Sequence, residues 1–575
     1  MRPSTQAQPA TGSSEDATPQ ALQSTCVYGR SPVVRWSSWV FALGLVVTQL
    51  ATVLAGSKSA WFAGLVVSMS LFGCLALSKF FAVRVDSVNL TACDDTKDKH
   101  DNKDKQDQKN QKNQTDKPAR KDQVDSDGQA NRSWNWFSIA AMGLVLLAGL
   151  VKAPHRSNDV YAYGAYGRLV SEHSVSPYTT RPSAFPDDPV IARMASGWRN
   201  TRSVYGPAFT AVSAAGMRLA GTSDLRERLW FQTLAAVATG LSALLLKRMS
   251  PRNWWLFALN PVTLIVVAHE GHNDALVGLG ILSALWFVEK AQARPRGSSR
   301  LAHGAIGSLV FAASIKITAV FAAPALVVFI LGHWGWKRAA KIGAPWALVC
   351  VGAFVATGGP SALGAFRGLR TVRSTTSLWH LDLIRRLTDS PRHSPGMLAL
   401  TIPAIAIVLT GLAVLWRSWS SWQSCWSRDS QPLDSRPLES FGTARTQATL
   451  QESLLEESQG PDLCHPHIHN HPYDFSWLVA LTLIPLVVFI ALGLYVLPWY
   501  WGWLLAPAIL LPGRFRFIVL LCAAAHSVAY GAGIQLHGTL STMLQIARFG
   551  APLAFVVVLV ASVNVLRRSL RSWVH

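Results

Sequence analysis

Asp159 is the residue of this chain with the clearest capacity for chemistry. Its carboxylate lies in a polar loop rich in tyrosine, directly after an apolar run at about residues 134–151. That run is long enough to cross a bilayer. A carboxylate that emerges at a membrane surface amid Tyr hydroxyls and Arg side chains is typical of a functional site. We therefore expect an integral membrane enzyme that acts on a lipid-anchored substrate.

The composition supports a membrane protein independently of any motif. Half of the 575 residues are hydrophobic and only 15% are charged, whereas soluble domains carry about 25% charged residues. The mean hydropathy is +0.23. Apolar runs recur from residue 34 to residue 566 and are separated by short links. This pattern predicts an all-α, polytopic helical bundle without a separate soluble catalytic domain.

Basic residues give the chain a formal charge of +21. They are scattered through the links between apolar runs and form no continuous stripe or known reader motif for nucleic acid. The positive-inside rule explains them, so we expect the lipid bilayer as a partner and no nucleic acid. The seven cysteines indicate no disulfide framework, because none falls in a loop assigned to the outer face.

The alternation of apolar runs and basic links also predicts the topology. About fourteen crossings place both ends of the chain and the basic links in the cytoplasm. The expected spans lie near residues 34–54, 60–83, 134–152, 229–246, 254–269, 274–289, 302–316, 317–333, 344–357, 397–416, 477–495, 500–512, 516–533 and 547–566.

The same count places four polar segments on the outer face, namely residues 153–228, 269–274, 358–395 and 498–503. Residues 206–221 leave an alternative open. We expect them to form an amphipathic helix in the membrane interface. If they crossed the membrane instead, every later loop would change sides.

Two polar stretches have too little apolar content to bury and are expected to be disordered. No cleavable signal peptide is visible before the first apolar run. The expected divisions are a disordered segment at 1–30, two transmembrane helices at 31–83, a disordered cytoplasmic loop at 84–133, and a transmembrane catalytic body at 134–575 that includes an external catalytic loop at 153–228 and a polar cytoplasmic loop at 417–476.

A histidine-rich tract at residues 464–471 has the side chains of a metal site. It lies on the face opposite Asp159, and its two-residue alternation suits an extended segment better than a closed four-ligand zinc site. Adventitious or no metal binding is the simpler interpretation, and a functional site is the alternative. We expect neither a metal ligand set nor a cofactor at the catalytic centre, although a dependence on divalent metal stays open.

An ordered series of short fragments begins at Asp159, in segments assigned to the outer face or next to it. The fragments are Asp159-Val-Tyr-Ala-Tyr163, Ser176-Pro-Tyr178, Trp198, Tyr205-Gly-Pro207, Asn260-Pro261, His272-Asn-Asp-Ala275 and Pro498-Trp-Tyr500. This series resembles the polyprenyl-phosphate-sugar-dependent glycosyltransferases of the GT-C superfamily, and most closely the actinobacterial alpha-1,6-mannopyranosyltransferases. One departure is Tyr166-Gly-Arg168, where broader relatives carry a second acid.

The resemblance implies a GT-C bundle of about 13–14 transmembrane helices with a catalytic first external loop. It implies transfer of mannose from a polyprenyl-phosphate-mannose donor to a mannan or lipoglycan acceptor on the extracytoplasmic face, forming alpha-(1->6) linkages with inversion. Asp159 would accept the proton of the acceptor hydroxyl. The lipid phosphate leaves as a stable anion, so one carboxylate suffices where glycosidases need two.

The resemblance also implies binding roles for other residues expected on the outer face. Cationic side chains would hold the donor phosphate, and aromatic side chains would stack on sugar. The expected substrate-binding residues are Tyr161, Tyr163, Arg168, Trp198, Arg199, Tyr205, His272, Asn273, Asp274, Lys316, Arg370, Trp499 and Tyr500, with Arg202, Arg367, Arg373 and His380 as further cationic candidates.

Simpler interpretations stay open for several of these residues. Asp159 and Asp274 could each cap the N-terminus of a helix. Asp187 and Asp188 lie between prolines, where turn formation explains them. Residues 498–503 could form an aromatic belt at the interface. For the whole chain, a multi-pass transporter or lipid flippase is the alternative, although no convincing internal repeat is visible.

Overall fold

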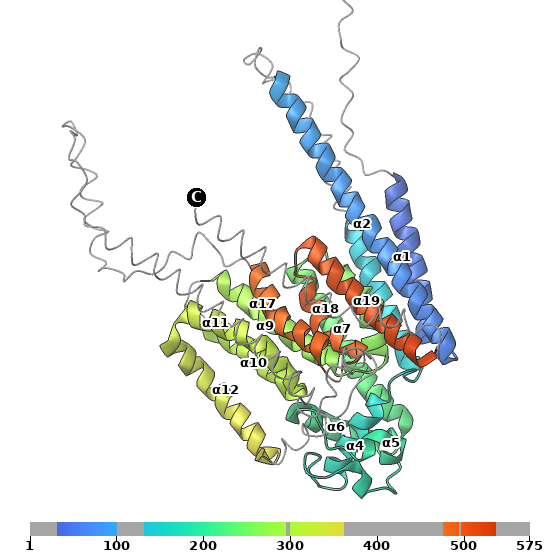
Figure 1. Cartoon of the computed structure of the whole chain (residues 1–575), viewed down its shortest axis with the longest axis vertical. Helices are drawn as coiled ribbons and strands as arrows, with labels where there is room; N and C mark the ends of the chain where they lie inside the picture. The colour runs from blue at the N-terminus through green and yellow to red at the C-terminus, as the bar shows by residue number, and fades with distance from the viewer. Residues whose placement is uncertain (1–31, 101–130, 295–298, 361–474, 494–495, 536–575) are drawn as a thin grey trace, which may run out of the picture. The chain divides into compact units, whose positions relative to one another are not determined.

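The computed structural model describes residues 32–100, 131–294, 299–360, 475–493 and 496–535. These residues form helices and connecting segments without a β-strand (Figure 1), which confirms the all-α prediction. They divide into two compact units. The smaller unit holds residues 32–41 and 74–100, and the larger unit holds the other described residues.

The N-terminal helices are α1 (Pro32–Val53) and α2 (Lys58–His100). Within the smaller unit, Ser38 Oγ lies 2.9 Å from Ser78 Oγ, so a hydroxyl pair joins the two helices. Helix α2 continues to His100, beyond residue 83, where we expected a disordered segment to begin. Extending an existing helix needs no new nucleation step, so a polar sequence can continue it.

Five helices among the described residues are long and apolar enough to cross a membrane. They coincide with the spans expected near 60–83, 134–152, 229–246, 317–333 and 344–357, which confirms a polytopic membrane protein. The expected spans near 397–416 and 547–566 lie outside the described residues. The five helices are Lys58–Lys79 of α2, Asn131–Val151, α7 (Asp224–Met249), Ile317–Trp334 and α12 (Trp336–Ala356).

The Ile317–Trp334 helix consists of a 3-10 turn, η5 (Ile317–Ala322), followed by α11 (Ala323–Trp334). It follows α10 (Ser299–Ile315), whose C-terminal end leads directly into η5 through Lys316. Helices α10, α11 and α12 contact one another and lie on the same side of the larger unit (Figure 1).

The chain around Pro261 differs from the continuous span expected near residues 254–269. Helix α8 (Trp255–Ala258) ends just before it, and a π-helix, η4 (Val262–His269), follows. Pro261 has no amide hydrogen to donate. The Val262 N–H is satisfied by the Asn260 side chain, whose Oδ1 accepts it at 2.8 Å. The sequence Asn-Pro therefore interrupts the helix before the turn into α9 (Asp274–Gln292).

Small residues bring α9 close to its neighbours. A Cβ added at Gly280 would lie 2.8 Å from the Ala312 Cβ of α10, and one added at Gly278 would overlap the Gly502 carbonyl. Such close backbone approach is how helices pack in membrane proteins. The packing also places Asp274, the first residue of α9, against Gly502.

The C-terminal part of the larger unit contains α17 (Phe475–Leu492), η9 (Pro498–Trp501), α18 (Gly502–Ala508) and α19 (Gly513–Gln535). The span expected near 500–512 is thus replaced by two short helices, with Pro507 inside the second. Every residue of η9 and α18 is buried. These helices contact α9, α17 and α19, so they are interior elements of the bundle.

The expected external loop, residues 153–228, is folded. Helices α4 (Asp159–Ser171), α5 (Ser196–Arg199) and α6 (Pro207–Ala220) lie together at the lower end of the view in Figure 1. The short helices η2 (Pro182–Ala184) and η3 (Ile191–Arg193) connect them. Their core contains Ala162, Ala165, Tyr166, Leu169, Ile191 and Met194, with Trp198 and Tyr205 packed against it.

Helix α6 bears on the two interpretations of residues 206–221. It has 14 residues, which at 1.5 Å per residue corresponds to about 21 Å. The hydrocarbon core of a bilayer is about 30 Å thick. The helix packs on α4, where a Cβ at Gly167 would lie 2.5 Å from the Ser213 carbonyl oxygen. The helix is shorter than the hydrocarbon core, which favours the interfacial interpretation over a membrane crossing.

Candidate active site

Three segments far apart in the sequence meet around Asp159. The His272 Nδ1 atom lies 3.4 Å from Asp159 Oδ2. The His272 ring stacks on the Trp499 ring with centroids 4.0 Å apart and an interplanar angle of 12°. The first turn of α4, the turn before α9 and the start of η9 thus meet at one site.

Asp159 is the first residue of α4 and does not occupy the cap position, which belongs to Asn158. Its backbone N–H donates to Ser157 Oγ at 3.1 Å. The carboxylate lies in the first turn, where the helix dipole favours a negative charge. Its side chain is 27% exposed, whereas His272 is fully buried. The arrangement leaves this carboxylate accessible, and capping does not account for it.

Glu270 holds the backbone that leads to Asp159. Its buried carboxylate accepts the N–H groups of His155 at 3.0 Å, Arg156 at 3.0 Å and Ser157 at 2.8 Å. We did not include Glu270 among the expected site residues, although it lies two residues before His272. The position of this acid next to the predicted binding motif His272-Asn-Asp-Ala275 was the sequence signal that could have identified it.

Gly271 lies between Glu270, which binds the backbone before Asp159, and His272, which lies beside the Asp159 carboxylate. Its φ is +73°, a conformation that favours glycine. A Cβ at this position would lie 2.7 Å from Val160 Cγ1, next to Asp159. The absence of a side chain therefore lets the turn approach the start of α4 closely.

Asp274 and Lys316 form a buried ion pair. The Lys316 ammonium donates to Asp274 Oδ1 at 3.0 Å and lies 3.9 Å from the centroid of the Tyr500 ring. Trp503 Nε1 donates to the same carboxylate oxygen. Asp274 is the first residue of α9 and the cap position belongs to Asn273, so capping is not its role either. Lys316, which we expected to contact a phosphate, is instead bonded to an acid of the protein.

Tyr163 and Tyr205 form an aromatic wall beside the site. Their rings pack edge to face with centroids 5.0 Å apart. The Tyr163 hydroxyl donates to Asn273 Oδ1 at 3.4 Å. Burial, reinforced by charges that include Asp159, raises the pKa of both phenols well above the usual value. Both therefore remain neutral hydrogen-bond donors.

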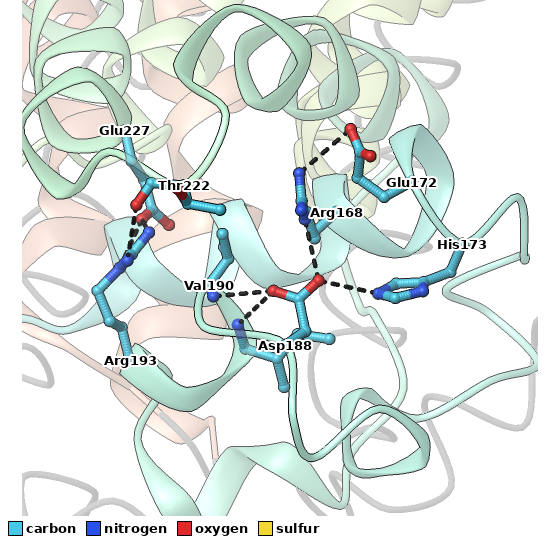
Figure 2. A network of polar contacts seen from close by, with 9 residues as sticks. Arg168, Glu172, His173, Asp188, Val190, Arg193, Thr222 and Glu227 are labelled. Atoms are coloured by element: carbon cyan, nitrogen blue, oxygen red, sulfur yellow. Dashed lines mark hydrogen bonds and ion pairs between the residues drawn. The ribbon is translucent and has the colours of Figure 1, made fainter.

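Arg168 lies in a separate polar network in the same loop (Figure 2). Its Nε donates to Asp188 Oδ2 at 2.9 Å, and its Nη1 lies 3.1 Å from Glu172 Oε1. Asp188 also pairs with His173 Nε2 at 2.9 Å and accepts the Val190 N–H at 2.8 Å. Arg168 is thus engaged by acids of the protein rather than directed at Asp159.

The carboxylate of Asp188 explains how the loop is held. Burial raises its pKa, but hydrogen bonds from Arg168, Val190 and His173 outweigh burial and lower the pKa below the usual value. The acceptance of N–H groups from Val190 and Ile191 agrees with the turn role considered for this residue.

Other expected binding residues also have structural contacts in the loop. Arg199 Nε donates to the Met194 carbonyl at 2.9 Å. Trp198 packs against the loop core. Burial and the nearby Asp224 carboxylate, at the start of α7, raise the pKa of Tyr161 to about 12. Arg367, Arg370, Arg373, His380 and the tract 464–471 lie outside the described residues.

Within the described residues, His155, His269 and Glu270 are the group able to hold a metal ion. One potential ligand atom of each lies within 4.8 Å of the others. This group adjoins the candidate active site and does not include Asp159 or Asp274. The expectation of no metal ligand at the catalytic carboxylate stays a prediction.

Residues 125–332 match the family profile described as alpha-(1->6)-mannopyranosyltransferase, N-terminal domain. This part of the chain is similar to that family. A curated relative, alpha-(1->6)-mannopyranosyltransferase A of Corynebacterium glutamicum, is 27% identical over an alignment that covers 36% of this chain and 42% of the relative. The match therefore spans less than half the length of that relative. No solved structure matches the chain.

The mannopyranosyltransferase match covers most of the candidate site. Asp159, His272, Asp274 and Lys316 fall within residues 125–332. Trp499, whose ring stacks on His272, lies beyond the matched residues. The structure thus joins a segment outside the family match to the catalytic candidates within it.

Proposed function

We propose that this protein is a membrane mannosyltransferase that uses a polyprenyl-phosphate-mannose donor. In this proposal the acceptor is a mannan or lipoglycan, the new linkage is alpha-(1->6), and the anomeric configuration is inverted. The observation that carries the proposal is the partly exposed Asp159 carboxylate beside the buried His272, inside the segment that matches the family.

The reaction needs one base. The acceptor hydroxyl oxygen bonds to the anomeric carbon of the donor while the bond from that carbon to the phosphate oxygen breaks. Asp159 takes the proton of the hydroxyl, and the lipid phosphate leaves with the electron pair of the broken bond. Because the phosphate is a stable anion, it needs no proton from the protein. A single displacement of this kind inverts the anomeric carbon.

His272 supports Asp159 in this role as a positioning residue. Its Nδ1 lies 3.4 Å from the carboxylate, and the stack on Trp499 fixes the plane of its ring. A base must be held within hydrogen-bond reach of the proton that it abstracts. In this proposal the buried imidazole restricts the positions open to the Asp159 side chain.

The donor phosphate requires a cationic side chain. The structure reduces the number of basic residues that are free to bind it. Arg168, Arg199 and Lys316 are already bonded to groups of the protein. Arg202 has no ion pair with a described residue, and its Nε is buried without a hydrogen-bond partner there. We assign phosphate binding to Arg202, with Arg367, Arg370 and Arg373 as further candidates. A hydrogen bond from an Arg guanidinium to a phosphate is charge-assisted and is therefore stronger than one between neutral groups.

Transfer of radiolabelled mannose tests the proposal. Membranes that contain the full-length protein are incubated with mannosyl-phospho-polyprenol and a short alpha-mannoside, and the product linkage is determined. We expect transfer from this donor and none from the sugar nucleotide. Asp159→Asn should lower the rate about 100-fold or more at equal expression. Transfer only from the nucleotide would refute the donor, and full activity of Asp159→Asn would refute the base.

Asp187→Asn is the matched control. Asp187 is an exposed acid in the same loop, so the loss of its charge should leave the rate unchanged. A reporter fused within residues 153–228 tests the further proposal that the active site faces the extracytoplasmic side. A cytoplasmic signal from that fusion would contradict the predicted orientation.

A further inference from the structure

Two histidines next to the candidate active site are each fixed by a backbone carbonyl. His155 Nε2 lies 2.7 Å from the Ala55 carbonyl oxygen, and His269 Nδ1 lies 2.9 Å from the Gly149 carbonyl oxygen. A carbonyl oxygen only accepts hydrogen bonds, so each of these ring nitrogens carries a hydrogen and donates it. This determines the tautomers of both neutral imidazoles.

The remaining ring nitrogens face each other. His155 Nδ1 lies 3.0 Å from His269 Nε2. In the tautomers just assigned, both nitrogens are unprotonated, so two lone pairs meet without a hydrogen between them. His269 is buried and His155 is partly buried, so lone pairs that face each other without a hydrogen-bond donor are unfavourable. The arrangement therefore calls for a positive centre between the rings, which is either a shared proton or a metal ion.

Glu270 offers a third possible ligand atom near the two imidazole rings. Ligand atoms of His155, His269 and Glu270 lie within 4.8 Å of one another. Glu270 Oε1 accepts one backbone N–H and Oε2 accepts two, so Oε1 retains acceptor capacity. A proton bridges two atoms only, whereas a metal ion uses all three donors. The buried carboxylate also offsets part of the charge of a divalent cation.

We propose that His155, His269 and Glu270 bind a divalent transition metal, for which zinc is the best fit. Two imidazole nitrogens and a carboxylate are a three-ligand set that leaves a fourth position for water. Nitrogens bound at 2.0–2.1 Å to a tetrahedral ion are roughly 3.3 Å apart. The observed separation of 3.0 Å needs only a small adjustment. Metal-bound histidines also donate their other N–H to carbonyl groups, as both rings do.

The metal would stabilise the two backbone segments that carry Asp159 and His272. Its ligands lie within the larger unit. His155 precedes Asp159 by four residues and His269 precedes His272 by three, so one ion ties together the two segments that carry this acid and its partner. The inference does not depend on the proposed transferase activity, because it concerns binding and stability.

Metal content of the purified full-length protein tests the inference. The protein carries no histidine tag, and His465, His467, His469 and His471 are replaced by serine so that the histidine-rich tract binds no metal. After incubation with Zn²⁺ and removal of excess, mass spectrometry of the elements should find about one zinc ion per chain. His155→Ala should reduce the zinc content to background.

A second measurement does not rely on the variant's folding. Protein treated with a chelator should have a lower thermal midpoint, and added Zn²⁺ should restore it. His303→Ala is the matched control, since His303 accepts a hydrogen bond from Trp346 Nε1 at 3.2 Å and lies outside the cluster. It should retain the zinc. Background zinc content, together with no thermal response to Zn²⁺, would overturn the inference and leave a shared proton between the rings.

Discussion

Asp159 and Asp188 are acids of the same folded loop, but their surroundings are opposite. Asp188 is buried, and its oxygens accept hydrogen bonds from Arg168, His173 and the backbone of Val190 (Figure 2). Asp159 keeps 27% of its side chain exposed, and its ion-pair partner among the described residues is His272 at 3.4 Å.

The comparison separates a structural acid from an acid available for chemistry. A carboxylate whose lone pairs are all engaged takes up a proton only by breaking bonds that hold the protein together. A carboxylate with open acceptor capacity loses little when it is protonated. The charge of Asp188 therefore stabilises the loop, whereas the charge of Asp159 remains available to a substrate.

The largest effect on stability is expected for Lys316→Met. This substitution tests Asp274, a further acid that is bonded within the protein as Asp188 is. This acid is fully buried, and the substitution would leave its charge without a cation. Breaking one side of a buried ion pair costs about 3–5 kcal/mol. The thermal midpoint in detergent measures the loss. Asp274→Asn combined with Lys316→Met should recover most of it, and a single variant as stable as the parent would show that the pair contributes nothing.

Asp188→Ala should reduce stability while the transfer rate per folded molecule stays close to that of the parent. The substitution leaves Arg168, His173 and two backbone N–H groups without their acceptor, which costs about 1–3 kcal/mol. Denaturant midpoints and initial rates measure the two quantities separately. Asp187→Ala, at an exposed position, should change stability by less than about 0.5 kcal/mol. A rate loss as large as that of Asp159→Asn would end the distinction between the two acids.

His272→Phe should lower the transfer rate without lowering stability. Phe keeps the stack on Trp499 and removes the partner of Asp159, so we expect about a tenfold lower rate. Both ring nitrogens of His272 are buried without a hydrogen-bond partner among the described residues, so their removal should leave the thermal midpoint unchanged or higher. Initial rates and thermal midpoints of the same preparation test this. A lower midpoint with an unchanged rate would assign His272 to structure alone.

The smallest expected effect is the loss of stability at acid pH that arises from Asp188. The pKa of Asp188 in the folded protein lies below its usual value, which is about 3.9 in an unfolded chain. Its charge therefore contributes stability that is complete above about pH 5 and is lost as the pH falls through the folded pKa. Thermal midpoints between pH 6 and pH 3 should fall more steeply for the parent than for Asp188→Asn. Equal slopes would mean that the network does not favour the ionised carboxylate.

The sequence indicated which segments share a face of the membrane, but not how their side chains would pair. The count of spans and basic links assigned the segments of Asp159, His272, Asp274 and Trp499 to one face, and in the structure His272 lies beside Asp159 and stacks on Trp499. The partner of Arg168 could not be predicted, because Asp188 reaches it only through the folding of η2 and η3 across α4. Likewise, the burial of Lys316 against Asp274 results from the close packing of α9 on α10 and α18, which a single sequence does not reveal.

The left-handed turn at Gly271 holds the segment of His272 close to that of Asp159. Alanine at this position would push against Val160 and oppose the turn's backbone conformation, so it would part the acid from the imidazole while leaving both intact. The Gly271→Ala variant would retain the side chains of the candidate active site and the residues proposed to bind the sugar donor and acceptor. Gly271→Ala is thus a suitable starting point for capturing the protein with both substrates bound.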